Sequence, residues 1–255
     1  HTELLQQGKG VIGNPVEMGS GESEVLSKIL SCPDYRKSFQ KWMRYTPEEK
    51  NVTMDHIVSA LSMYYSSFSY ASAPFDDAMH HRASIPETAV KGFNLFMGKA
   101  QCATCHFVPL FNGVKPPYLS SEFEVVGVPE DTFYLRLSAD EGRYKVHPVP
   151  EMMHAFRTGT VRNSSHTAPY MHNGVFSSLH QVMDFYNKGG AQGRGLSLPN
   201  QTLSPDPLAL TSEEIEQLLA FLKTLDESIP KESPPDALPR SGDPTLNARK
   251  IGGAY

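Results

Sequence analysis

Cys102-Ala103-Thr104-Cys105-His106 is the stretch of this sequence that decides the fold. Two cysteines with two residues between them, followed directly by histidine, form the attachment signature of a c-type haem. In that chemistry the two thiols add to the vinyl groups of the porphyrin, and the histidine becomes the proximal ligand of the iron. Haem c is attached outside the cytoplasm, so we expect a periplasmic or otherwise exported protein.

Two other interpretations of a CxxC motif fit this sequence less well. A structural zinc site needs four ligands, and the one remaining cysteine, Cys32, lies far upstream. A thioredoxin-like redox pair follows a strand in a βαβ pattern, and no such pattern precedes Cys102. We expect Cys32 to be a small packed residue rather than a reactive thiol.

Length and charge limit the remaining possibilities. The chain has 255 residues and a formal net charge of −5 at pH 7. That length is enough to bury the core of one large domain or two small ones. The acidic balance gives no basic field for nucleic acid, and no apolar run reaches the length of a membrane span. The opening HTELLQQGKG lacks the pattern of a signal peptide, so we expect a mature or truncated exported chain.

Apolar residues recur at helical spacing along most of the chain, which predicts a mainly α fold. We expect helices over residues 22–30, 34–43, 52–68 and 212–225, one that runs from Pro86 toward the haem motif, and one that is capped by Ser177. Thr211 and Glu214 have the spacing of a capping box. Residues 107–165 are rich in Pro, Gly and Asn, and we expect a long irregular wrap around a porphyrin. The proline-rich stretch after Asp226 is predicted to be an extended or disordered tail.

A haem iron has a second axial position, and the chain offers many possible ligands for it. These candidates are several histidines, Tyr186, and the methionines at 152, 153, 171 and 183. Each of them taken alone is more typical of a packed or exposed side chain than of a ligand. Spacing alone does not choose among them.

Several segments, in the same order along the chain, resemble the bacterial dihaem cytochrome c peroxidase family, which includes the MauG-type enzymes. The similar segments are GVIGNPVEM at 10–18, GFNLFMGKAQCATCH at 92–106, FRTGTVRN at 156–163, TAPYMHNG at 167–174, FYNKGG at 185–190 and LTSEEIEQLLAFLKTL at 210–225. The resemblance implies cytochrome c-like haem domains. It also implies a peroxidase that reduces hydrogen peroxide at one haem, with electrons relayed through the haem on His106.

The chain departs from the family pattern in one large way. Family members carry an earlier CxxCH for a first, peroxide-reacting haem ahead of the NPVEM segment, and this sequence contains no such motif. Its one tryptophan, Trp42, is not at the place of the family's inter-haem tryptophan. We therefore expect a remnant of the peroxidatic domain at 1–85, a cytochrome c-like domain at 86–226 and a tail at 227–255. A missing segment, a partner chain or a fragment is expected to supply the second haem.

Glu17 is the catalytic candidate that the resemblance implies. The glutamate of the family's NPxEM segment stands over the open face of the peroxidatic haem and moves a proton between the two peroxide oxygens. A carboxylate suits this role because burial can shift its pKa toward working pH. The alternative is a surface glutamate in the first turn of a helix, where the macrodipole favours it.

Tyr186 is the candidate for the sixth iron ligand. Classical members of the family use a methionine fourteen residues after the histidine of TAPYxH, and counting from His172 leads to Tyr186. A tyrosine at this place resembles the MauG-type pattern. Tyrosinate is a hard anion that favours oxidised iron, which implies high-valent chemistry on a protein substrate rather than easy electron uptake from a small redox protein. The alternative is that Tyr186 packs in the core and Met183, or no residue, ligates the iron.

Three weaker assignments follow from the same resemblance. A calcium ion is expected on the backbone carbonyls of Thr167 and Pro169, because calcium prefers hard oxygen ligands. Arg162 is expected to pair with a haem propionate, and His172 to orient groups near the inter-haem loop. A different class of function stays open: a non-catalytic, single-haem electron-transfer protein of the c type.

Overall fold

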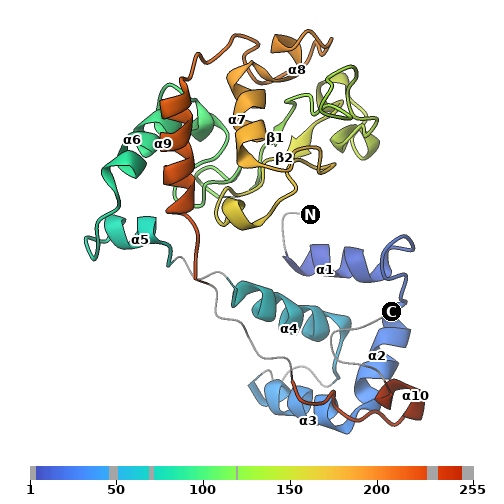
Figure 1. Cartoon of the computed structure of the whole chain (residues 1–255). Coiled ribbons are helices and arrows are strands. Elements are labelled where there is room, and N and C mark those ends of the chain that lie inside the picture. The colour runs from blue at the N-terminus through green and yellow to red at the C-terminus, as the bar shows by residue number, and fades with distance from the viewer. Residues whose placement is uncertain (1–3, 46–50, 69–71, 119, 229–234, 249–255) are drawn as a thin grey trace. The chain divides into compact units, whose positions relative to one another are not determined.

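The computed structural model describes residues 4–45, 51–68, 72–118, 120–228 and 235–248, and most of its regular structure is α-helical, as predicted (Figure 1). Internal contacts divide the chain into two units. The first contains residues 1–70 and 229–255, and the second contains residues 71–228. The sequence prediction placed this boundary near residue 85. In the structure Phe75 packs into the core of the second unit, so the contact boundary lies earlier in the chain.

The first unit is built from helices. They are α1 (Leu4–Gly13), α2 (Glu22–Ser31), α3 (Pro33–Trp42), a 3₁₀ turn (Met43–Tyr45), α4 (Met54–Ser66) and the short α10 (Pro244–Asn247). Pro33 begins α3 because its fixed φ suits the first helical position and its missing N–H leaves no bond unmade. The helix α1 was not anticipated from the sequence. Its segment carries three glycines that obscure the periodicity.

The core of the first unit is small and apolar. Its buried members are Ile12, Phe39, Met54, Ile57 and Val58. A Cβ atom at Gly8 would lie 2.7 Å from the Val58 side chain, so the absence of a side chain there lets α1 approach α4 closely. Cys32 is buried, which confirms the prediction of a packed residue.

The C-terminal tail returns to the first unit. The hydroxyl groups of Ser31 and Ser241 lie 3.1 Å apart, and the Gly242 amide donates to the Ser31 carbonyl at 3.3 Å. The described part of the tail, residues 235–248, is therefore held against the end of α2. The sequence had left an extended tail and a disordered tail as alternatives, and residues 229–234 and 249–255 lie outside the described residues.

The second unit combines helices with long irregular connections. Its helices are α5 (Pro74–Met79), α6 (Glu87–Met97), α7 (Leu179–Asn187), α8 (Gly190–Gly193) and α9 (Ser212–Lys223), and its strands β1 (Phe123–Glu124) and β2 (Phe156–Arg157) pair antiparallel. The described residues between 107 and 165 form no α-helix, as predicted. The capping box of Thr211 and Glu214 at the start of α9 is confirmed. At α7 the capping residue is Ser178 rather than Ser177, because its side chain accepts the Gln181 amide.

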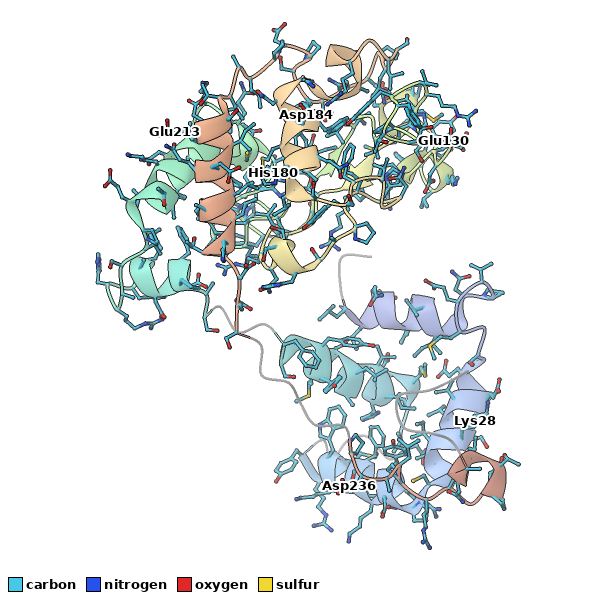
Figure 2. The ribbon with its side chains drawn as sticks, in the orientation of Figure 1. Lys28, Glu130, His180, Asp184, Glu213 and Asp236 are labelled. Atoms are coloured by element: carbon cyan, nitrogen blue, oxygen red, sulfur yellow. The ribbon has the colours of Figure 1, made fainter. Side chains whose placement is uncertain are left out.

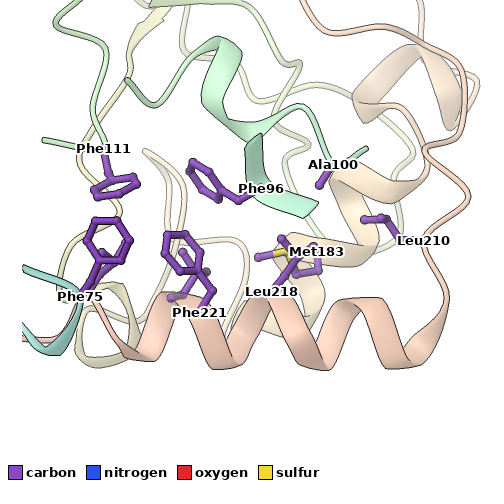
Figure 3. Close-up of a cluster of buried hydrophobic side chains, with 10 residues drawn as sticks. Phe75, Phe96, Ala100, Phe111, Met183, Leu210, Leu218 and Phe221 are labelled. Carbon is purple, nitrogen blue, oxygen red and sulfur yellow. The ribbon is translucent and has the colours of Figure 1, made fainter. Parts of the chain in front are cut away.

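An aromatic core holds α6 and α9 together in the second unit. The rings of Phe111 and Phe221 lie in edge contact with each other and with both Phe75 and Phe96, with centroids between 5.2 and 5.7 Å apart (Figure 3). A Cβ at Gly92 of α6 would lie 1.9 Å from the Gln217 carbonyl oxygen, so only glycine fits at this helix crossing. The core thus fixes the helix that leads into the haem motif. Within the described part of the chain, no helix is both long and apolar enough for a membrane span.

Candidate haem site

The CxxCH motif lies one short turn beyond the end of α6. Residues Cys102–Thr104 form a single 3₁₀ turn, and Gln101 before it takes a left-handed conformation with φ of 56°. The His106 amide donates to the Cys102 carbonyl at 2.9 Å. The two cysteines and the histidine therefore belong to one compact turn, anchored by the packed helix before it.

His106 is oriented by a carbonyl far along the chain. Its Nδ1 lies 3.0 Å from the Gly159 carbonyl oxygen, which only accepts hydrogen bonds, so Nδ1 carries the proton. Nε2 then has a free lone pair, which is the arrangement found in metal-ligating histidines. Burial lowers the pKa of His106, although backbone hydrogen bonds with Phe111 and Gly159 oppose this. The imidazole is therefore neutral at pH 7, as ligation requires.

The two thiols of the motif have the wrong acidity for redox exchange. Burial raises the pKa of Cys102 to about 12 and that of Cys105 to about 11. Disulfide exchange needs an accessible thiolate with a lowered pKa, so these values argue against a thioredoxin-like pair. Both cysteines are free in the structure, as thioether attachment to a porphyrin requires.

Tyr186 of α7 reaches the same region. Burial raises the pKa of its phenol, and the neighbouring Cys102, Cys105 and Glu124 raise it further. Electrostatic influence falls with distance, so Tyr186 lies in the same part of the second unit as the two cysteines. The donor set around the motif therefore holds two thiols, an imidazole with one free nitrogen and a phenol, which fits haem c.

Met183, the competing ligand, lies in the core of the second unit. It is buried in the same cluster as Phe96 and Leu218, where its thioether fills the space beside α9 (Figure 3). Methionine is well suited to such irregular gaps. Cys102 packs against this same cluster, so Met183 stays the alternative to Tyr186 as a ligand.

Glu124 is a member of this site that sequence reasoning missed. It lies on β1 opposite Phe156, and its carboxylate helps to raise the pKa of the Cys105 thiol. A carboxylate here adds negative charge beside the donor set, which electrostatically favours an oxidised metal. No sequence signal marks it, because Glu124 comes 19 positions after Cys105 and the irregular connection between them sets its direction.

Arg162 has a partner other than the predicted propionate. Its guanidinium forms a bidentate pair with Asp76 at 2.8 and 2.7 Å and also donates to the Pro109 carbonyl. The carboxylate of Glu227 lies 3.6 Å away. The guanidinium of Arg162 is already paired with protein groups, so the geometry gives no support to its predicted contact with a haem propionate.

The remaining predicted residues lie at the surface or in separate contacts. Glu17 is exposed in a turn after α1, where its amide donates to the Asn14 carbonyl at 2.9 Å. It belongs to the first unit, whereas the CxxCH turn belongs to the second. The His172 ring stacks on Phe156 with centroids 3.7 Å apart, and its Nε2 lies 3.2 Å from the Ser138 hydroxyl.

The expected calcium ligands are carbonyls at an exposed segment. No described residue donates a hydrogen bond to the carbonyl oxygen of Thr167 or Pro169, so both oxygens are free to bind water or a cation. The part of the chain that the structure describes contains no group of three or more His, Cys, Asp or Glu side chains arranged for a metal ion.

Comparisons with known proteins agree with these features. Residues 1–84 match the family model described as di-haem cytochrome c peroxidase. The chain is 31% identical to the cytochrome-c peroxidase IdrP2 of Pseudomonas sp. (strain SCT) over 235 residues, which cover 84% of this chain and 59% of the relative. It is also 31% identical to the methylamine utilization protein MauG of Methylorubrum extorquens, with coverage of 87% and 58%.

A solved structure has a similar fold over most of the chain. A MauG-like protein associated with microbial copper homeostasis superposes with a TM-score of 0.70 and 25% identity, covering 88% of this chain and 69% of that protein. The chain spans just under three fifths of the length of the two curated relatives named above. The haem-attachment turn, the sequence relatives and this structural likeness together show that the chain belongs to the dihaem cytochrome c peroxidase/MauG family.

Proposed function

We propose that this chain is part of a haem c peroxidase that reduces hydrogen peroxide, with electrons passing through a haem held on His106. The observation that carries the proposal is the CxxCH turn with its oriented histidine. Cys102 and Cys105 would hold the haem covalently, and the Nε2 atom of His106 would bind its iron. When bound, the haem supplies a redox-active iron.

Tyr186 is the proposed sixth ligand. Its support is that its phenol lies in the same part of the second unit as both cysteines, and Met183 stays the alternative. The raised pKa means that the phenol keeps its proton in the protein without haem. Ligation as tyrosinate therefore depends on the charge of the iron to displace that proton. A tyrosinate ligand suits the storage of oxidising equivalents, which favours a protein substrate as the electron donor. A small redox protein is the other kind of electron donor proposed.

Glu17 is the proposed catalytic acid–base of the peroxide step. Its carboxylate would take a proton from the inner peroxide oxygen and return it to the outer one, so that the O–O bond breaks with water as the leaving group. Its support is the match of residues 1–84 to the family model, which includes the segment around Glu17. The haem that this residue serves is proposed to come from a further segment, chain or fragment.

The surroundings of the site belong to the same proposal. The Thr167 and Pro169 carbonyls are proposed to hold a calcium ion together with ligands from outside this chain. Export from the cytoplasm is proposed because covalent attachment of haem c takes place outside the cytoplasm. The Arg162 propionate contact is not proposed, since Asp76 occupies the guanidinium.

Intact mass, a pyridine haemochrome assay and visible spectra with and without hydrogen peroxide test the proposal on the full-length protein. We expect covalent haem on this chain, peroxide-dependent spectral change and peroxide consumption. One haem per protein, with no spectral response to peroxide, would show instead a non-catalytic electron-transfer protein.

A further inference from the structure

A second group of aromatic rings leads from Tyr186 to the surface of the second unit. The Phe185 ring centroid lies 5.5 Å from that of Tyr186 and 6.4 Å from that of Tyr134, whose plane is within 13° of parallel to it. Phe176 lies 5.4 Å from Phe185 and 6.3 Å from Tyr134. Phe176 and Phe185 are fully buried. The rings therefore form a continuous apolar path through the interior.

Tyr134 forms the outer end of this path. It lines a hollow of about 370 Å³, a size within the range of small-molecule sites, about 300–1,000 Å³. The other lining residues are Thr132, Phe176, His180, Gln181 and Asp184. His180 and Asp184 both project from α7 (Figure 2). The hollow thus has an aromatic floor and a polar rim, which suits a small phenol.

Charged groups beside Tyr134 make its oxidised form a stronger oxidant toward a bound donor. The Arg194 guanidinium lies 3.8 Å from the ring centroid, and Arg194 also pairs with Asp184. A cation over the face of a ring stabilises its π electrons, so Tyr134 in its oxidised form would draw an electron strongly from a nearby donor. Burial opposes ionisation of Asp184, but hydrogen bonds from Lys188 and Arg194 outweigh it and lower the pKa of that carboxyl. An ionised carboxylate therefore lines the hollow.

Packing accounts for the rings but not for the hydroxyl group. Phenylalanine at position 134 would keep the stacking on Phe185 and the contact with Arg194, since both involve the ring alone. The phenol O–H is the part of Tyr134 that can lose an electron and a proton together. The inference below concerns that group.

We propose that Tyr134 is the residue at which the protein oxidises a small phenol bound in this hollow, and that Phe185 and Tyr186 connect it to the haem on His106. The proposal rests on the proposed peroxidase function, with hydrogen peroxide as the oxidant. Each Tyr134 oxidation sends one electron toward Tyr186 and one proton to Asp184 or water. The bound phenol then returns a hydrogen atom to Tyr134 and leaves as a phenoxyl radical. Two turnovers consume two phenols and one hydrogen peroxide and form two phenoxyl radicals and two waters.

Radical trapping on the full-length, haem-loaded protein tests the proposal. Hydrogen peroxide is added with a nitroso spin trap, and the adduct is located by tryptic digestion and mass spectrometry. We expect an adduct on Tyr134 that excess guaiacol suppresses. Tyr134→Phe should abolish this adduct and lower guaiacol oxidation by at least about tenfold, while haem content and the resting visible spectrum stay unchanged.

Tyr118→Phe is the matched control, since Tyr118 is exposed in the same unit and, among the described residues, no ring contact joins it to the path. This variant should keep both the Tyr134 adduct and the guaiacol rate. A wild-type protein whose haem spectrum does not respond to peroxide would overturn the proposed function and the path together. A normal spectral response with no adduct on Tyr134, or with an unchanged guaiacol rate in Tyr134→Phe, would overturn the path alone.

Discussion

The two units hold their predicted functional residues in different ways. In the first unit Glu17 is exposed, and a turn closed by Asn14, three positions earlier, sets its backbone. In the second unit His106 is oriented by Gly159, 53 positions later, and Tyr186 lies on a helix that packs on an aromatic core. A substitution at the functional residue of the first unit should therefore change activity without changing stability. Substitutions near the functional residues of the second unit should change both. Variants in both units can break or sharpen this contrast.

The largest effect is expected for the double variant Cys102→Ala/Cys105→Ala. Removing both thiols removes both points of attachment, so the chain should carry no covalent haem by intact mass. Cys32→Ala is the control in the first unit and should keep the full haem mass, because Cys32 is a packed residue. Covalent haem on the double variant would refute the assignment of the motif.

The next largest effect is expected for Glu17→Gln. Loss of a general acid–base lowers turnover by about 10²–10⁴-fold, so peroxide consumption by the full-length protein should fall in that range. The unfolding free energy should change by less than about 0.5 kcal/mol, as for other exposed positions. Glu22→Gln, at another exposed glutamate of the first unit, should leave both quantities unchanged. Wild-type turnover in Glu17→Gln would remove Glu17 from the mechanism.

Gly92→Ala tests the coupling in the second unit. The new Cβ would lie 1.9 Å from the Gln217 carbonyl oxygen, so α6 and α9 must separate. We expect a loss of about 3 kcal/mol or more in unfolding free energy, measured by circular dichroism in urea, together with reduced haem attachment. Gly13→Ala in the first unit meets nothing within 4 Å and should not destabilise. Equal stability of the two variants would contradict the helix crossing described above.

A smaller effect concerns pH and the pair of Asp76 with Arg162. The hydrogen bond from Arg162 outweighs burial and lowers the pKa of Asp76 in the folded state. The carboxyl of Asp76 therefore binds a proton more readily in the unfolded chain than in the folded one, near pH 4. Its contribution to the unfolding free energy is present above that pH and is lost as the pH falls through the folded pKa. We expect Asp76→Asn to lose about 1.5–3 kcal/mol of unfolding free energy at pH 7. The difference in unfolding free energy between Asp76→Asn and the wild type should become smaller toward pH 2. A difference that does not depend on pH would show that the pair has no electrostatic role.

Local sequence patterns were enough to predict most of the fold and part of the candidate site. Helical periodicity located α2, α3, α4, α6, α7 and α9, and the CxxCH motif located the haem turn. The helix α1 was missed because glycines break its pattern, and α5 because it spans only Pro74–Met79. Both helices depend on packing partners far along the chain, which local periodicity does not report.

Side-chain direction in the irregular segments was beyond prediction. Glu124 approaches Cys105 only because β1 pairs with β2, and those two strands are more than thirty positions apart. Arg162 was assigned to a propionate, whereas Asp76 is its partner, at a separation of 86 positions. Tyr186 was chosen by counting within a known motif, a signal that does not depend on tertiary contacts, and its ligation of iron stays a prediction.

The tail contact changes how the chain would have to be divided for expression. Residues 235–248 fold with α2, so the second unit is an insertion within the first rather than a C-terminal domain followed by a linker. A truncation after residue 228 would keep the whole haem-binding unit yet leave the end of α2 without its Ser241 and Gly242 partners. Within the second unit, residues 71–228, the Phe75 amide donates to the Thr224 carbonyl at 3.0 Å, so the beginning and the end of this unit pack together and it is the natural piece to express alone.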